Sequence, residues 1–429
     1  MLISVDILPE VFLYSCGSGL LFWLLYRHYI FSVVDPLFIF VITTSFASVL
    51  VLKTVEDPRN IIHYFICELS AWAGFAWIQK RTGNPAVQVS PKKVDVQFTD
   101  VMLLRYTNYI LFSIYLVANL IILRTKGFAL LSDAPTTAKV ANFQEGFGIF
   151  RKINWAVGGV SSAGLLFLYI LERKRIDILM FLLIVGFSAL EGSKSALLHY
   201  VVMALLLVYH PAFRHQERLR RQIKQYAPLT VIAVFAVIFA VLIRENSDTE
   251  GVLLAFVRRL LYGADSTLFF YNPANIEYFT RYSWTDFPNY IINPILGFLR
   301  LAPYQEAFGN VMVENTLPPG VTMDVIVGPN SSFYIEGQVF FGFYGAFVYS
   351  FVLGCLTSWM RTMYFSLIHS SAFALVFLNV IYQFSTLILT DLKLFITQSF
   401  DAILLVLPVY VLICFIVNRK LIIRRLRFN

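Results

Sequence analysis

The sequence predicts an all-α polytopic membrane protein, and three observations support this fold class. The mean hydropathy is +0.70. Only 14% of the 429 residues are charged, against about 25% in ordinary soluble proteins. Apolar runs of roughly 16–24 residues recur along the chain, and runs of that length can cross a hydrocarbon core about 30 Å thick.

Taken in chain order, these runs predict about eleven transmembrane helices. The expected spans are 10–31, 36–53, 60–79, 104–123, 153–171, 176–191, 195–210, 228–243, 333–357, 370–390 and 402–418. The runs at 176–191 and 195–210 are among the shortest. No basic segment precedes the first run, so we expect no cleaved signal peptide.

The basic residues predict the orientation of the chain in the membrane. Alternate connections hold 20 of the 34 Lys and Arg residues. These are Arg27, 80–105, 172–177, 211–227, Arg361 and 418–429. The positive-inside rule places this set in the cytoplasm, so the N-terminus is expected outside and the C-terminus inside. The basic stretch "HPAFRHQERLRRQIKQ" is then expected to contact anionic lipid headgroups rather than nucleic acid.

The connections divide the chain into three regions. Residues 1–243 contain the first eight spans and a smaller outer loop at 124–152. Residues 244–332 form an outer loop of 89 residues that holds seven of the 16 prolines, and 333–429 contain the last three spans and the basic cytoplasmic tail. A structureless connection of that length is uncommon. We therefore expect a partly helical cap, with short surface helices in "EGVLLAFVRRLLYGADSTLFFY" and "YIINPILGFLRLAP".

The sequence gives no indication of a metal or a cofactor. All four cysteines fall inside predicted spans, where they are expected to be small apolar core residues. No HExxH, Walker or GxGxxG motif is present. No carboxylate-rich cluster suggests a divalent cation, so we expect chemistry without a metal.

The basic residues of the large outer loop are all arginines. They are Arg244, Arg258, Arg259, Arg281 and Arg300. A guanidinium binds phosphate oxygens in a bidentate way and keeps its charge at any working pH. Arg244 directly follows an apolar run and is the strongest functional candidate. Arg258 and Arg259 are either phosphate ligands or members of a solvated face, paired with Glu245, Asp248 or Glu250.

A second candidate anion site lies in "SALEGSKSALLHY", the short outer connection between two spans. Lys194 is expected to begin the next helix, with Ser193 and Ser195 on either side. A helix N-terminus attracts anions through its free N–H groups and its dipole. Lys194 and the two hydroxyls therefore form a candidate phosphate-binding site. Ser193 is also a suitable N-cap residue for the helix.

Glu336 is the candidate base. It lies in "GPNSSFYIEGQVFFGFYG", where a polar loop becomes an apolar helix. An ionisable group at membrane depth suggests function, and a carboxylate can take a proton from an attacking hydroxyl. Alternatively, Glu336 pairs with a loop arginine and fixes the cap. Glu68, inside the third span, is a weaker candidate of the same kind.

These features resemble the O-antigen and capsule repeat-unit polymerases, often called Wzy-type. The similarity comprises the many spans, the large outer loop with its arginines, "GSKSALL" at the start of a span, and the acid-then-glycine helix start "SSFYIEGQVFFGFYGAFVYSFVLG". A loose RxxxG pattern is present as Arg259 and Gly263. In the related ligase branch the Lys194 position is commonly an arginine.

The resemblance implies a membrane glycosyltransferase of the bacterial inner membrane that acts on its periplasmic face. Donor and acceptor would both be oligosaccharides linked to undecaprenyl diphosphate, and a chain-length regulator is a possible partner. Glu336 and Arg244 would be catalytic. Diphosphate-binding residues would be Lys194, Arg244, Arg258, Arg259, Ser193 and Ser195. Sugar-binding residues would be Arg281, Tyr262, Tyr278, Trp284 and Tyr334, although aromatic residues also collect at membrane interfaces.

Three alternatives stay open at this point. An O-antigen ligase would perform the same chemistry on a lipid A-core acceptor. A flippase for lipid-linked oligosaccharides predicts broken helices and charges along a central path, whereas few charges, mainly Glu68, fall inside the predicted spans. A structural partner of other envelope enzymes would not need Glu336 or Arg244.

Overall fold

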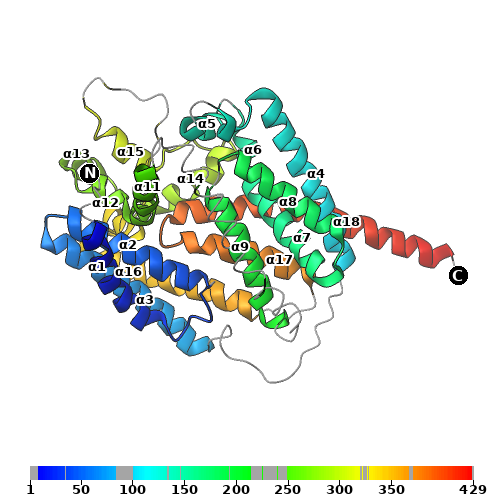
Figure 1. The fold of residues 1–429 in the computed structure, drawn as a ribbon, viewed down its shortest axis with the longest axis horizontal. Coiled ribbons are helices and arrows are strands. Elements are labelled where there is room, and N and C mark those ends of the chain that lie inside the picture. The colour runs from blue at the N-terminus through cyan, green and yellow to red at the C-terminus, as the bar shows by residue number, and fades with distance from the viewer. Residues whose placement is uncertain are drawn as a thin grey trace. The chain divides into compact units, whose positions relative to one another are not determined.

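The computed structural model describes residues 8–33, 35–83, 100–132, 135–144, 146–192, 194–213, 249–318, 328–366 and 371–427, with the single positions 225, 239, 321 and 326. Within these ranges every regular element is a helix (Figure 1). The chain forms two compact units. Unit 1 comprises Met1–Val89, Asn246–Met363 and Phe384–Thr397, and unit 2 comprises Ser90–Glu245, Tyr364–Gln383 and Gln398–Asn429.

Seven segments of the described chain are long and apolar enough to cross a membrane. They are Leu8–Tyr26, Pro36–Thr54, Pro58–Thr82, Val101–Leu131, Gly148–Glu172, Phe333–Phe365 and Leu392–Val417. This supports the predicted class of helical membrane protein. Three further predicted spans coincide with shorter helices, α8 (Arg175–Leu190), α9 (Lys194–Tyr209) and α17 (Ala372–Phe384). The run at 228–243 lies outside the described residues, so the count of eleven stays a prediction.

Three helices of unit 1 begin where an acidic or amide side chain precedes a proline. Asp35 accepts a hydrogen bond from the Leu37 N–H and caps α2 (Pro36–Thr54). Asp57 caps α3 (Pro58–Thr82), and Asn272 caps α13 (Pro273–Phe279), in the same way. The side chain satisfies a free N–H of the first turn, and proline at the first helical position already has a helical φ.

The first three helices pack with α16 (Phe333–Phe365), and they lie side by side in Figure 1. One apolar cluster joins α1 (Leu8–Tyr26), α2 and α3 through Phe22, Tyr26, Leu37, Val41 and Phe75. Helices α3 and α16 meet backbone to backbone. A Cβ atom added to Gly74 would lie 2.0 Å from the Phe351 carbonyl oxygen, so the close approach requires glycine, as is common between membrane helices.

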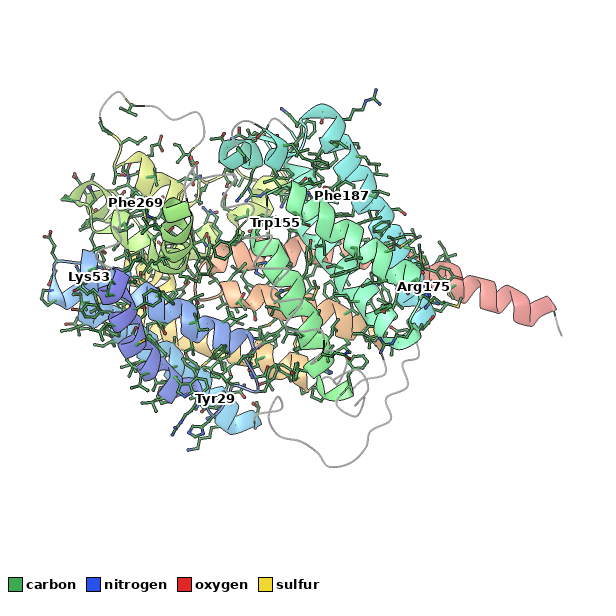
Figure 2. The ribbon with its side chains drawn as sticks, in the orientation of Figure 1. Tyr29, Lys53, Trp155, Arg175, Phe187 and Phe269 are labelled. Carbon is green, nitrogen blue, oxygen red and sulfur yellow. The ribbon has the colours of Figure 1, made fainter. Side chains whose placement is uncertain are left out.

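Polar contacts fix both ends of this bundle. Arg361 makes a buried, bidentate ion pair with Asp35, at 2.6 and 2.7 Å, and donates to the Tyr29 carbonyl. At the other end Lys53 pairs with Glu10. Tyr29 and Lys53, labelled in Figure 2, mark the two ends of the α1–α2 pair. The end of α3 and the end of α16 therefore lie beside the α1–α2 connection.

Helix α16 reverses direction at Gly342. This residue has φ 73° and ψ 177°, a conformation that is essentially limited to glycine. Residues nine positions apart on a straight helix are roughly 13 Å apart. Here a Cβ atom on Gly337 would lie only 2.9 Å from the Ala346 Cα. We call 333–341 the first limb and 343–365 the second limb, and the two limbs pack against each other.

The described part of the long loop of unit 1 contains five short α-helices, α11 (Thr249–Leu261), α12 (Ser266–Phe270), α13, α14 (Phe287–Phe298) and α15 (Phe308–Glu314). Both stretches expected to hold short helices do so, at α11 with α12 and at α14. Helix α11 packs through Val257 and Leu261 against Val11 of α1 and Val49 of α2. This part of the loop therefore contributes to the core of unit 1.

Unit 2 is a second helical bundle. Helix α4 (Val101–Thr125) packs on α7 (Gly158–Glu172), and α7 packs on α8 and α9, as Figure 1 shows. Asp100 caps α17 by accepting from the Ala372 N–H at 2.5 Å. Its other elements are α5 (Pro135–Ala141), α6 (Gly148–Lys152), a π-helical turn at Ile153–Val157 and most of α18 (Leu392–Arg427).

Candidate functional site

Glu336 lies on the first limb of α16 and is completely buried. Its carboxylate accepts two hydrogen bonds. The Tyr349 hydroxyl donates to Oε2 at 2.9 Å, and the Tyr290 hydroxyl donates to Oε1 at 3.2 Å. Tyr349 comes from the second limb, so the reversal at Gly342 brings the acid and this donor together. Among the described side chains, the partners of Glu336 are these two tyrosines and not a loop arginine.

Tyr290 projects from α14 and is held from three sides. Its ring stacks on Phe308, with centroids 4.3 Å apart, and its hydroxyl also lies 3.2 Å from the Ser331 hydroxyl. Burial, followed by the negative charges of Glu336 and Asp391, raises the pKa of Tyr290 well above its usual value. Tyr290 therefore stays a protonated donor to Glu336.

Two charged residues at the start of α18 complete the surroundings of Glu336. The Lys393 ammonium is buried, lies 4.5 Å from the centre of the Tyr290 ring, and donates to the Gln305 carbonyl at 3.3 Å. Asp391 accepts from the Leu394 N–H at 2.8 Å. Burial raises the pKa of Asp391 to about 6, although that N–H and Lys393 oppose the rise. Both charges act electrostatically on Glu336.

The loop before α16 is fixed by backbone packing. A Cβ atom on Gly309 would lie 1.7 Å from the Pro329 carbonyl oxygen, so α15 approaches this loop as closely as two backbones can. Asn310 accepts from the Gly328 N–H at 2.8 Å. The Ser332 hydroxyl lies 2.9 Å from that of Ser266. These contacts set the position of the first limb and hence of Glu336.

A groove with a volume of about 1230 Å³ lies beside this cluster in unit 1. Tyr349 connects the two, because its ring lines the groove and its hydroxyl donates to Glu336. The lining is mostly aromatic and aliphatic. It comprises Asn60, Phe270, Tyr271, Ile276, Phe279, Thr280, Tyr282, Ser283, Trp284, Phe287, Gln338, Val339, Phe340, Phe341, Gly342, Gly345, Val348, Tyr349, Val352, Leu353, Leu356 and Leu392.

One wall of the groove is a stripe on the second limb of α16. Residues from Gly345 to Leu356 repeat at intervals of three and four and so lie on one helix face, over a length of about 16 Å. Val348 and Val352 are 67% and 54% exposed, so the groove opens sideways from the helix. A membrane helix would present this opening to lipid.

The segment 278–284 forms the rim of the groove and holds three of the residues predicted to bind sugar. The Arg281 guanidinium stacks over the Tyr278 ring at 3.4 Å. Trp284 lines the groove and is 69% exposed. Arg281, Tyr278 and Trp284 are therefore gathered at one place, next to the apolar groove.

Tyr334 is a correction to the predicted sugar-binding set. It is buried, its hydroxyl lies 2.5 Å from that of Thr267, and its ring packs edge-on against Tyr64. The ring is thus packed in the core and does not line the groove. Glu68 is also buried in α3, and it does not line the groove.

The predicted diphosphate-binding set stays a prediction, because most of it lies outside the described residues. Arg244 and Ser193 lie outside the described residues, as do the side chains of Lys194, Ser195, Arg259 and Tyr262. Lys194 begins α9 in unit 2, as expected. Arg258 lies on α11 in unit 1.

Sequence reasoning missed Tyr290, Tyr349, Asp391 and Lys393. In the sequence, Tyr290 and Tyr349 could not be distinguished from the many aromatic residues expected at the membrane interfaces. Asp391 and Lys393, in "TDLKLF", were detectable as charged residues in the short connection between the last two predicted spans. No group of three or more His, Cys, Asp or Glu side chains in the described part of the chain is placed to hold a metal ion.

Comparison with family models, with curated proteins and with solved structures found no match to this chain. Its function must therefore be argued from the site. The groove can hold an elongated apolar ligand with a polar end at the rim. Tyr349, which lines the groove, donates its hydroxyl hydrogen to the buried acid. Together these are the elements needed for base-assisted chemistry on an amphiphilic substrate.

Proposed function

We propose that this chain is a membrane glycosyltransferase that polymerises oligosaccharide repeat units linked to undecaprenyl diphosphate. The observation that carries the proposal is the groove whose wall includes Tyr349, the donor to the buried Glu336. An apolar groove open to lipid suits a polyprenyl tail, and the aromatic rim suits sugars. The resemblance to Wzy-type polymerases supports the same assignment, with the site on the periplasmic face of the bacterial inner membrane.

The proposed reaction is a substitution at the anomeric carbon of the donor chain. A hydroxyl of the acceptor repeat unit attacks that carbon, and the bond from the carbon to the diphosphate oxygen breaks. The lipid diphosphate leaves with the bonding electrons. Glu336 receives the hydroxyl proton through Tyr349, which accepts one proton as it gives another. Cationic side chains would stabilise the growing charge on the diphosphate, and Lys194, Arg244, Arg258 and Arg259 stay the predicted set.

A reconstitution assay tests the proposal. Purified protein in liposomes is incubated with a synthetic undecaprenyl diphosphate repeat unit, and the products are separated by length. We expect a ladder of lipid-linked oligomers, weakened about 10- to 100-fold in Tyr349→Phe, because the relay hydroxyl is lost. Transfer only to an added lipid A-core acceptor would instead identify a ligase. Absence of both products from correctly folded protein would contradict the proposal.

One observation favours a second candidate, a flippase for the same lipid-linked oligosaccharides. Helix α16 is broken at Gly342, and transporters use such breaks at their binding sites. Several charged side chains are also buried in unit 1, among them Asp35, Glu336, Arg361 and Lys393. A fluorescent lipid-linked oligosaccharide in liposomes distinguishes the two, since a flippase changes the leaflet of the probe but not its length.

A further inference from the structure

The Lys393 ammonium has an unusual environment. The side chain is only 6% exposed, although transferring an ammonium out of water is costly. Its described partners are one backbone carbonyl, that of Gln305, and the face of the Tyr290 ring. No carboxylate of the described residues lies within 4.0 Å of it, the limit for an ion pair. A lysine that served only stability would be expected to contact an acid directly, as Lys152 does with Asp401 in unit 2.

The position of Lys393 relates it to Glu336. The ammonium lies over the ring of Tyr290, and the hydroxyl of the same tyrosine donates to Glu336. Only the side chain of Tyr290 therefore links the Lys393 ammonium to the Glu336 carboxylate. At that separation a positive charge favours the ionised form of an acid in a medium of low dielectric. Lys393 does not donate a hydrogen bond to either oxygen of Glu336, so each oxygen still accepts from its tyrosine.

All groups that face Glu336 must be considered together. Tyr349 comes from the second limb of α16, Tyr290 from α14, and Asp391 and Lys393 from the start of α18. The two tyrosines donate hydrogen bonds and carry no charge. Asp391 is negative when ionised and opposes the ionisation of Glu336. Lys393 is the one cation among these four groups, so it is the group that offsets Asp391.

We propose that Lys393 is a positioning residue for the base: its ammonium, held over the Tyr290 ring, favours the ionised form of Glu336 in a buried site shared with Asp391. This rests on the proposed function in so far as Glu336 acts as the base. Without Lys393, Glu336 and Asp391 are two neighbouring buried acids, and such a pair retains a proton to higher pH. A larger share of Glu336 then starts the reaction protonated.

The test follows the protonation of Glu336 directly. Infrared difference spectra of the full-length protein against Glu336→Gln report the carboxyl C=O band of Glu336 as a function of pH. In Lys393→Met we expect the midpoint of this titration to move up by about one pH unit or more. Lys393→Arg keeps the charge and should restore the wild-type midpoint. Lys53→Met, which removes an exposed lysine far along the chain, is the matched control and should change nothing.

A second variant keeps the test decisive if Lys393→Met does not fold. Asp391→Asn removes the opposing charge and retains Lys393, so the midpoint should move down. An unchanged midpoint in whichever of the two variants folds overturns the inference. In the polymerisation assay at neutral pH, Lys393→Met should lower kcat about tenfold with little change in KM, and the loss should shrink as the pH is raised.

These readouts separate the inference from the proposed function. If the titration shifts but the wild-type protein makes no polymer, the role of Lys393 stands and the glycosyltransferase proposal fails. If polymer forms but the titration of Glu336 does not respond to Lys393, the proposed function stands and the inference fails.

Discussion

Glu336 in unit 1 and Asp401 in unit 2 are both buried, but their carboxylates are held in different ways. In unit 2, Asp401 makes a direct ion pair with Lys152 at 2.6 Å, and Glu191 accepts from the Asn154 amide at 3.0 Å. In unit 1, Glu336 accepts hydrogen bonds from two tyrosine hydroxyls, and the Lys393 ammonium contacts the ring of one of these tyrosines, Tyr290. A direct ion pair fixes both the charge and the position of an acid. Two phenol donors fix its position and leave it free to take up a proton.

This difference separates a structural role from a chemical one. Asp401 and Glu191 resemble stabilising contacts between helices, because each has a partner that suits its ionised form or its shape. Glu336 has the partners of a group that changes its protonation state beside a ligand groove. The predictions below test that separation, beginning with the largest expected effect.

Glu336→Gln should lower the rate of transfer by about 10²- to 10⁴-fold, because glutamine keeps the shape and accepts no proton. The same replacement at Glu191 in unit 2 should leave the rate within about twofold. Product formation per unit time by purified, reconstituted protein is the measurement. Equal losses in both variants would remove the distinction between the two regions.

Lys152→Met should lower the free energy of unfolding by about 3 kcal/mol, because it leaves the buried Asp401 charge without its partner. We expect the lower end of the usual range, since Lys152 is 21% exposed. Adding Asp401→Asn should recover most of the loss. Denaturant unfolding in detergent measures both variants, and a stability unchanged in the single variant would argue that the pair is not structural.

Gly342→Ala should destabilise unit 1 by about 1–2 kcal/mol, because alanine strongly disfavours positive φ. The cost is conformational, since no atom lies within 4 Å of the position of the added Cβ. Gly186 in α8 also has nothing within 4 Å, but it has an ordinary helical φ. Gly186→Ala should therefore stabilise the protein slightly, by about 0.5–1 kcal/mol. If both variants changed the melting temperature in the same way, the reversal of α16 at Gly342 would be contradicted.

Asp391→Asn should change the pH dependence of stability. The folded-state pKa of Asp391 is raised from 3.8 to about 6 by burial, so ionising it costs the folded protein free energy as the pH rises from about 4 to 6. Below that window the acid is protonated in both folded and unfolded states, and the cost is absent. The variant should therefore melt higher than wild type at pH 7 and equally at pH 4. A constant difference across this range would contradict the assignment.

Much of the fold was predictable, because composition and apolar run length depend only on the local sequence. The positions of α1 to α4, the short helices α11 and α14, and the place of Glu336 at the start of a helix all follow from such local signals. The reversal at Gly342 does not, since the sequence does not show which of several glycines adopts a positive φ. A straight helix was the natural reading of "EGQVFFGFYGAFVYS".

The surroundings of Glu336 were not predictable for a related reason. Tyr290 lies 46 residues before it, and Lys393 follows it much later at the start of another helix. Only tertiary packing brings them together. The ion pair of Arg361 with Asp35, separated by 326 residues, was hidden in the same way. Arg361 was read as a positive-inside signal, although its charge is neutralised by Asp35.

The most direct test of the central claim asks where a lipid diphosphate binds. The probe is undecaprenyl diphosphate with a photoreactive diazirine in its tail, irradiated with the protein in liposomes and mapped by mass spectrometry. We predict saturable labelling of the stripe at Val348, Val352 and Leu356, which unlabelled undecaprenyl diphosphate competes away. Saturable labelling confined to unit 2, or labelling of the stripe that competitor does not reduce, would contradict the assignment of this groove.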